Sequence, residues 1–99
     1  MPTVMRMRWS GLTPDQYEEA RQIVNWEGDP PNGARFHIAW FEGNDLRVVD
    51  LWDSSEDFQA FVNDRLNPGV QQVGIEGEPE VEMSDAHAVF APAYEGSAA

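Results

Sequence analysis

The chain contains no cysteine and no lysine among its 99 residues. Without cysteine it can form no disulfide, no thiolate metal site and no cysteine nucleophile. Its six basic residues are all arginines and face 18 aspartates and glutamates, so the formal net charge is −12. Such an acidic chain, which has no basic stripe, repels phosphate backbones and anionic lipids, and we therefore expect no nucleic-acid or membrane partner.

Long apolar runs and nucleotide-binding motifs are missing as well. No segment approaches 18 consecutive apolar residues, and the opening MPTVMRMRWS lacks the apolar stretch of a signal peptide. We therefore expect a cytoplasmic protein. The sequence holds no GxGxxG, no P-loop and no GxSxG, which argues against a phosphate cradle or a serine-hydrolase elbow.

The first half of the chain has clear periodicities. Residues 3–10 alternate between apolar and polar, which predicts a strand. Thr13, Pro14 and Gln16 form a capping-box helix start, and the amphipathic pattern that follows ends near Asn25. Two apolar runs, 34–42 and 46–52, flank the short turn EGND and predict a β-hairpin.

The second half repeats this plan. Ser54 and Asp57 predict a second capping box, and the following residues place a buried stripe on one helix face. The stripe consists of Phe58, Phe61, Val62 and Leu66. We expect Pro68 to end or kink this helix, residues 81–90 to form the last strand, residues 1–92 to be one domain and residues 93–99 to be a flexible tail.

The element order β-α-β-β-α-β predicts a ferredoxin-like α+β fold, in which an antiparallel sheet of strand order 4-1-3-2 carries two helices on one face. The other face would then expose aromatic and apolar side chains to water. A second copy of the chain would cover them, so we expect a homodimer with its sheets face to face.

The segment RVVDLWDSSEDFQAFVNDRLNPG (47–69) and the later AHAVF (86–90) resemble the dimeric α+β barrel proteins, in particular small actinobacterial proteins similar to antibiotic-biosynthesis monooxygenases. The resemblance implies a dimer. That superfamily includes cofactor-independent monooxygenases of aromatic polyketides, haem-degrading enzymes, isomerases and ligand-binding regulators, so it does not settle the activity. The haem-degrading branch carries a histidine on the second helix, where this chain has none. We therefore expect no cofactor.

Asp50 lies between Val49 and Leu51 in an otherwise apolar strand. As a buried carboxylate it could act as a general base or orient a histidine. It could equally pair with an arginine of its own or a neighbouring strand, Arg6, Arg8 or Arg47, and hold the sheet or the dimer together. Both interpretations remain open at this stage.

His37 and His87 are the two histidines of the chain, and the predicted topology places them on opposite edge strands. Each could be an acid–base group or a structural histidine bonded to backbone or carboxylate. Asp85 has the same strand parity as His87 and could fix its tautomer. A metal site needs three or four converging ligands, and we expect none here.

Aromatic side chains could line a pocket for a flat ligand, and Tyr17 could supply a hydroxyl to it. The resemblance makes Trp52 a counterpart of a tryptophan used by polyketide monooxygenases. Aromatics at strand spacing are also typical of a core or an interface. The candidates for ligand binding are Trp52, Trp40, Phe36, Tyr17 and Phe90.

Three functions follow from these residues. The first is a cofactor-independent monooxygenase- or isomerase-like enzyme for an aromatic or polyketide-like compound, with His87 or His37 and Asp50 as proton carriers. The second is a non-catalytic protein that binds a small apolar ligand, and the third is a structural or partner-binding dimer without a ligand. A cavity between sheet and helices favours the first two, whereas a space filled by aromatic side chains would exclude both.

Overall fold

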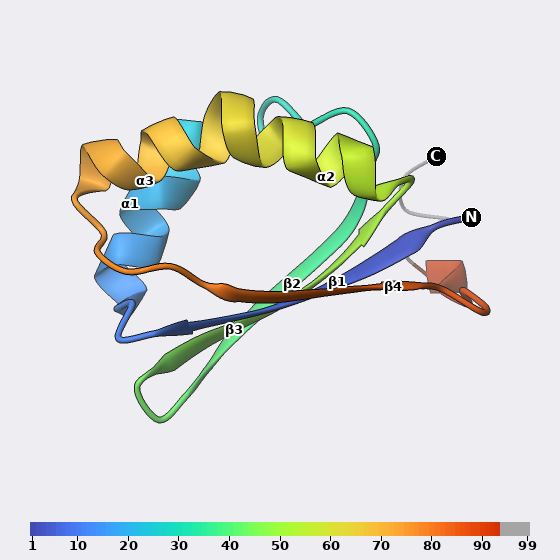
Figure 1. Cartoon of the computed structure of the whole chain (residues 1–99), viewed down its shortest axis with the longest axis horizontal. Coiled ribbons are helices and arrows are strands. Elements are labelled where there is room, and N and C mark those ends of the chain that lie inside the picture. The colour runs from blue at the N-terminus through green and yellow to red at the C-terminus, as the bar shows by residue number, and fades with distance from the viewer. Residues whose placement is uncertain (94–99) are drawn as a thin grey trace.

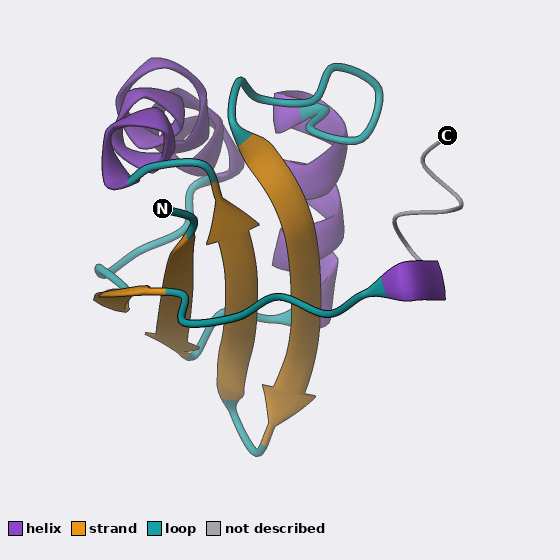
Figure 2. Cartoon of the chain, turned by 90° about the vertical axis from the view of Figure 1, so that its right-hand side faces the viewer, coloured by secondary structure: helices purple, strands orange, loops and turns teal. Residues whose placement is uncertain are grey.

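The computed structural model describes residues 1–93. The predicted ferredoxin-like α+β fold is confirmed, because the two helical segments lie on one face of a four-stranded antiparallel sheet whose strand order is β2-β3-β1-β4 (Figures 1 and 2). Residues 94–99, most of the predicted tail, lie outside the described residues. The elements are β1 (Thr3–Ser10), α1 (Pro14–Val24), β2 (Ala34–Glu42), β3 (Asp45–Trp52), α2 (Ser55–Phe61), η1 (Val62–Leu66), α3 (Asn67–Val73) and β4 (Glu80–Asp85).

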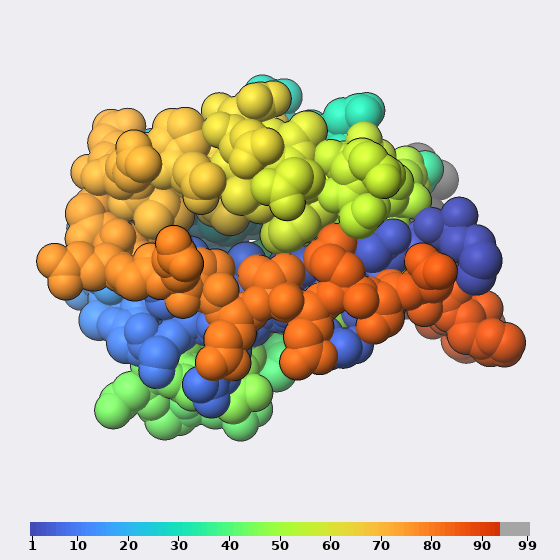
Figure 3. All heavy atoms as spheres, viewed as in Figure 1, coloured from blue at the N-terminus to red at the C-terminus, as the bar shows by residue number. Residues whose placement is uncertain are grey.

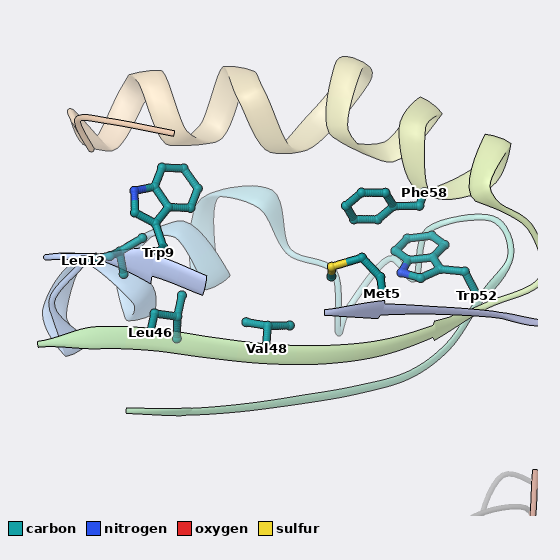
Figure 4. Close-up of a cluster of buried hydrophobic side chains, with 7 residues drawn as sticks. All are labelled: Met5, Trp9, Leu12, Leu46, Val48, Trp52 and Phe58. Atoms are coloured by element: carbon teal, nitrogen blue, oxygen red, sulfur yellow. The ribbon is translucent and has the colours of Figure 1, made fainter. Parts of the chain in front are cut away.

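The sheet has a covered face, which lies beneath the helices, and an open face on the other side. Alternation along β3 places Leu46, Val48, Asp50 and Trp52 on the covered face, where each is buried. The hydrophobic core lies between this face and the helices (Figure 4). It consists of Met5, Trp9, Leu12, Leu46, Val48, Trp52 and Phe58.

The first helix begins and ends as its sequence predicts. Thr13 Oγ1 accepts a hydrogen bond from the Gln16 N–H, and the Gln16 side chain accepts one from the Thr13 N–H, which completes the capping box. Asn25 ends the helix in a left-handed conformation. This turn directs the chain into the loop that precedes β2.

The second helical segment differs from its prediction at both the cap and the proline. Ser54 Oγ accepts from the Asp57 N–H, but the Asp57 carboxylate accepts from Asn32 across the fold, so the box is only half formed. The chain also does not stop at Pro68. The π turn η1 gives Asn67 a hydrogen bond to the Val62 carbonyl, and Pro68 then stands in the first turn of α3, where no N–H is needed.

The last strand is shorter than predicted. It ends at Asp85, and the Ala86 N–H makes a final hydrogen bond to the Pro2 carbonyl. The pairing partner runs out at this point, because β1 begins at Thr3 opposite Asp85. The following residues therefore leave the sheet and cross from the β4 side toward the β2 side (Figure 2). His87 and Phe90 lie on this exposed segment and not on an edge strand.

The open face is divided between charged and apolar residues. On its β1–β4 side, Arg6 pairs with Glu82 at 2.9 Å and Arg8 with Glu80 at 3.2 Å. On its β2 side, Ile38 is 47% exposed and Trp40 is 38% exposed. Within residues 1–93, no helix is long and apolar enough to cross a membrane.

Candidate functional site

A cavity of about 240 Å³ lies between the covered face of the sheet and the helices. The walls come from β1, β2, β3, α1, α2 and α3, and from the loop between α1 and β2. A second hollow of about 160 Å³ lies beside β4, at the seam between that strand and the helical segment (Figure 3). The sheet–helix space is therefore not filled by the core, which favours the two ligand-based functions. The lining of the larger cavity is mainly apolar and includes Met5, Trp9, Leu12, Trp26, Pro30, Pro31, Phe36, Leu46, Val48, Trp52, Phe58, Phe61 and Leu66.

Four side chains of the cavity wall form one chain of hydrogen bonds. The Tyr17 hydroxyl lies 2.8 Å from His37 Nε2, and His37 Nδ1 lies 2.6 Å from Asp50 Oδ1. The chain ends at Trp52, whose indole N–H donates to Asp50 Oδ2 at 3.1 Å. All four residues line the cavity.

The β2–β3 hairpin accounts for the contact between His37 and Asp50. Glu42 pairs with Asp45 across the turn, and this register makes His37 the direct cross-strand neighbour of Asp50. The two side chains therefore point to the same face of the sheet. Trp52 lies two residues along the same strand and so also shares that face.

This register also bears on the arginine pairing considered for Asp50. Met5, and not an arginine, is its partner on β1. Arg6, Arg8 and Arg47 point to the open face and pair with other carboxylates there. Within the described residues no pair between Asp50 and these arginines forms, because their side chains lie on the opposite side of the sheet. Asp50 instead meets a histidine at the cavity.

The donors around Asp50 assign the proton positions in the chain. A carboxylate can only accept, and the Trp52 N–H can only donate. Asp50 therefore accepts at both oxygens, and His37 carries its proton on Nδ1. When the ring is neutral, His37 Nε2 is left as an acceptor for the Tyr17 hydroxyl. This is the arrangement of a base whose tautomer is fixed by a carboxylate.

Tyr17 lies on α1, and its side chain reaches toward the sheet and packs among aromatic rings. Its ring lies nearly parallel to that of His37 and edge-on to Trp26 and Phe41. Burial raises the pKa of its hydroxyl to about 12, and Arg21 only partly offsets this effect. The hydroxyl therefore remains protonated at neutral pH.

The structure brings some of the sequence-predicted residues together and separates others. Tyr17, His37, Asp50 and Trp52 meet at the cavity, and Phe36 joins its wall next to an irregularity in strand register at the start of β2. The remaining candidates are outside its lining. Trp40 lies on the open face, and His87 and Phe90 lie on the exposed segment after β4.

Trp26 and Arg35 are cavity residues that the sequence analysis missed. The Trp26 ring lies 5.5 Å from that of His37, and Arg35 pairs with Asp53 at 2.6 Å. A signal for Trp26 was present, because it directly follows the residue predicted to end the helix. Among the described residues, no group of three histidine, aspartate or glutamate side chains is placed to hold a metal ion.

No protein-family model matches the sequence, and no curated protein matches it significantly. Solved structures do match the fold. A Nitrosomonas europaea protein of unknown function has a TM-score of 0.68 and 17% identity over 93% of this chain and 95% of its own. The cofactor-independent oxygenase SnoaB from Streptomyces nogalater has a TM-score of 0.63 and 14% identity over 90% and 95%.

A further match is a candidate antibiotic biosynthesis monooxygenase from Nitrosomonas europaea, with a TM-score of 0.67 and 10% identity over 87% of this chain and 90% of its own. At these identities the similarity concerns the fold and not the chemistry. It confirms at the level of fold the resemblance drawn from residues 47–69. The chain has the α+β fold of the antibiotic-biosynthesis-monooxygenase-like proteins.

Proposed function

We propose that the protein is a cofactor-independent monooxygenase for an aromatic, polyketide-like compound, and that the His37–Asp50 pair accepts the substrate proton. The observation that carries the proposal is a carboxylate-oriented histidine on the wall of an apolar, aromatic-rich cavity. Such a cavity suits a flat ligand, and the histidine suits removal of a weakly acidic proton. The description of SnoaB as a cofactor-independent oxygenase supports the same reaction class.

The chemistry can proceed on the substrate itself. Loss of a proton from an acidic methylene or enolic hydroxyl leaves an electron-rich anion, which can reduce dioxygen without a metal or flavin. For a three-ring ketone such as anthrone, the methylene carbon becomes a carbonyl, one oxygen atom enters the product and the other leaves as water. An isomerase would use the same base but return the proton to another carbon.

The test is oxygen consumption with anthrone as the probe. We expect the wild type to accelerate the reaction over buffer, and His37→Gln and Asp50→Asn to lower kcat by about 100-fold or more, because they remove the proton acceptor or its orienting partner. Affinity for anthrone should change little. Gln22→Ala, an exposed change on α1, is the matched control.

The outcomes separate the candidate functions. Anthrone binding without acceleration would support the non-catalytic ligand-binding function instead. Full activity in both His37→Gln and Asp50→Asn would show that this pair is not the catalyst. His87→Gln is a separate arm, because a loss there with His37→Gln unaffected would move the role to His87.

We also propose that a second copy of the chain covers the open face. Exposed Ile38 and Trp40 on the β2 side supply apolar area of the kind that a partner buries. Light scattering should give a dimer mass at micromolar concentration. Ile38→Asp should give a monomer mass at that concentration, because it would bury an unpaired charge in the interface. A monomeric wild type would contradict the proposal.

A further inference from the structure

Both ring nitrogens of His37 are occupied. Nδ1 meets Asp50 at 2.6 Å, and Nε2 meets the Tyr17 hydroxyl at 2.8 Å. A ligand in the cavity therefore finds no free nitrogen on this histidine, although His37 is the proposed proton acceptor. Either Tyr17 moves away when the ligand binds, or Tyr17 itself meets the ligand.

The packing around Tyr17 favours the second possibility. Trp26 and Phe41 contact its ring edge-on at centroid distances of 5.8 and 6.3 Å, and the His37 ring runs parallel to it. Rings on several sides hold the phenol in one direction. The side chain also comes from an 11-residue helix that is capped at both ends, so its backbone is anchored.

The Tyr17 hydroxyl can both give and receive a proton. When the His37 ring is neutral and carries its proton on Nδ1, the Tyr17 hydrogen points to Nε2, and within residues 1–93 this is the hydrogen bond that the hydroxyl makes. A phenolic oxygen can still accept another hydrogen bond through its lone pairs. Since Tyr17 lines the cavity, that acceptor is available to a bound molecule.

We propose that Tyr17 is a catalytic residue that binds a phenolic or enolic hydroxyl of the substrate and relays its proton to His37. The inference rests on the proposed function and names the ligand group that the site recognises. The substrate O–H proton passes to the Tyr17 oxygen while the Tyr17 proton passes to His37 Nε2. The negative charge is then on the substrate, and the imidazolium is stabilised by Asp50.

The ionisation state of Tyr17 agrees with a proton relay through a neutral hydroxyl and not with a permanently ionised phenolate. Because burial raises its pKa to about 12, the hydroxyl is neutral at physiological pH and keeps its proton available to His37. Arg21, Glu18, Glu27 and Asp50 are the charged groups that act on it, and their effects are smaller than that of burial. The relay therefore returns to its starting state whenever His37 loses the extra proton.

Tyr17→Phe is the decisive variant, because the phenylalanine ring keeps the aromatic packing and removes only the oxygen. The binding probes are 1-naphthol and 1-methoxynaphthalene, which differ in the O–H donor. We expect the wild type to prefer naphthol by roughly tenfold, the scale of one hydrogen bond. Tyr17→Phe should lose this preference and keep its affinity for methoxynaphthalene.

Turnover of anthrone, whose enol tautomer carries the hydroxyl that Tyr17 would bind, gives the second readout. Tyr17→Phe should lower kcat by about 100-fold, within the usual range for loss of a proton-transfer group. If Tyr17 only shields His37, the variant should match or exceed the wild type and retain the naphthol preference, which would overturn the relay while His37→Gln remained inactive. Full turnover in His37→Gln would instead refute the proposed function, whatever Tyr17→Phe shows.

Discussion

On the covered face of the sheet, the Asp50 side chain is 9% exposed and receives hydrogen bonds from two fixed ring donors, whereas on the open face Glu82 is 74% exposed and meets the long side chain of Arg6. Asp50 lies on β3 and Glu82 on β4, and both strands pair with β1. Because side chains alternate along a strand, these two carboxylates lie on opposite faces of the sheet. Water competes for Glu82 and screens its charge. Around Asp50 the aromatic wall takes the place of water, so the same chemical group fixes the orientation of the His37 ring.

The largest expected effect compares a tryptophan of the cavity wall with a tryptophan of the open face. Trp52→Ala should destabilise the fold by about 3–5 kcal/mol, because it opens the core and removes a donor to Asp50. Trp40→Ala, on the open face and 38% exposed, should cost clearly less. Urea unfolding at a single protein concentration measures both, and equal losses would contradict the difference between the faces.

The next effect tests the carboxylate itself. Asp50→Ala leaves the Trp52 N–H and His37 Nδ1 without their acceptor, so we expect a loss of about 1–3 kcal/mol in unfolding free energy. Raising the salt concentration should leave this loss nearly unchanged, because the site is shielded from solvent ions. A loss of unfolding free energy that disappears at high salt would mean that Asp50 behaves as a solvent-exposed carboxylate.

The third effect is a response to alkali on the covered side. The Tyr17 pKa is about 12 in the fold and 10.0 in a model peptide, so the unfolded chain releases this proton first. Stability should therefore fall as pH rises from about 10 and level off above about 12. Tyr17→Phe should remove that part of the decline. A near-ultraviolet phenolate titration that shows no late-ionising tyrosine in the wild type would contradict the prediction.

The smallest effect belongs to the open face. Glu82→Ala should cost less than about 1 kcal/mol, because the pair with Arg6 is exposed and screened. Chemical unfolding at low and high salt should show a small loss that shrinks further as salt is added. A loss as large as that of Asp50→Ala would mean that Glu82 is buried in the assembled protein.

The sequence could predict the fold because its periods, caps and turns agree with one another. The sequence also encodes part of the site, through the register of the hairpin. The two-residue turn at Gly43 and Asn44 sets Glu42 opposite Asp45, and counting back along the hairpin places His37 opposite Asp50. The same parity along β1 places methionines, and not arginines, beside Asp50.

Other features depend on contacts that no local pattern encodes. The approach of Tyr17 to His37 follows from how α1 packs over the sheet, and Trp26 reaches the cavity through a loop. The end of β4 is set by where its partner strand begins, which the run VEMSDAHAVF alone cannot reveal. Proline statistics predicted a helix break at Pro68, but the preceding π turn accommodates it.

The π turn from Val62 to Leu66 has a consequence for the history of this gene. Its Arg65 donates to the Val24 carbonyl at the end of α1, and its Leu66 lines the cavity. The Asn67 N–H reaches back five residues to the Val62 carbonyl, one residue more than in an α turn, so a single-codon deletion in this segment would let it close as a regular α turn and keep the helix after it in phase. Point substitutions at its exposed positions leave the helix phase intact. This segment should therefore tolerate the loss of one residue better than the regular helix α1 does.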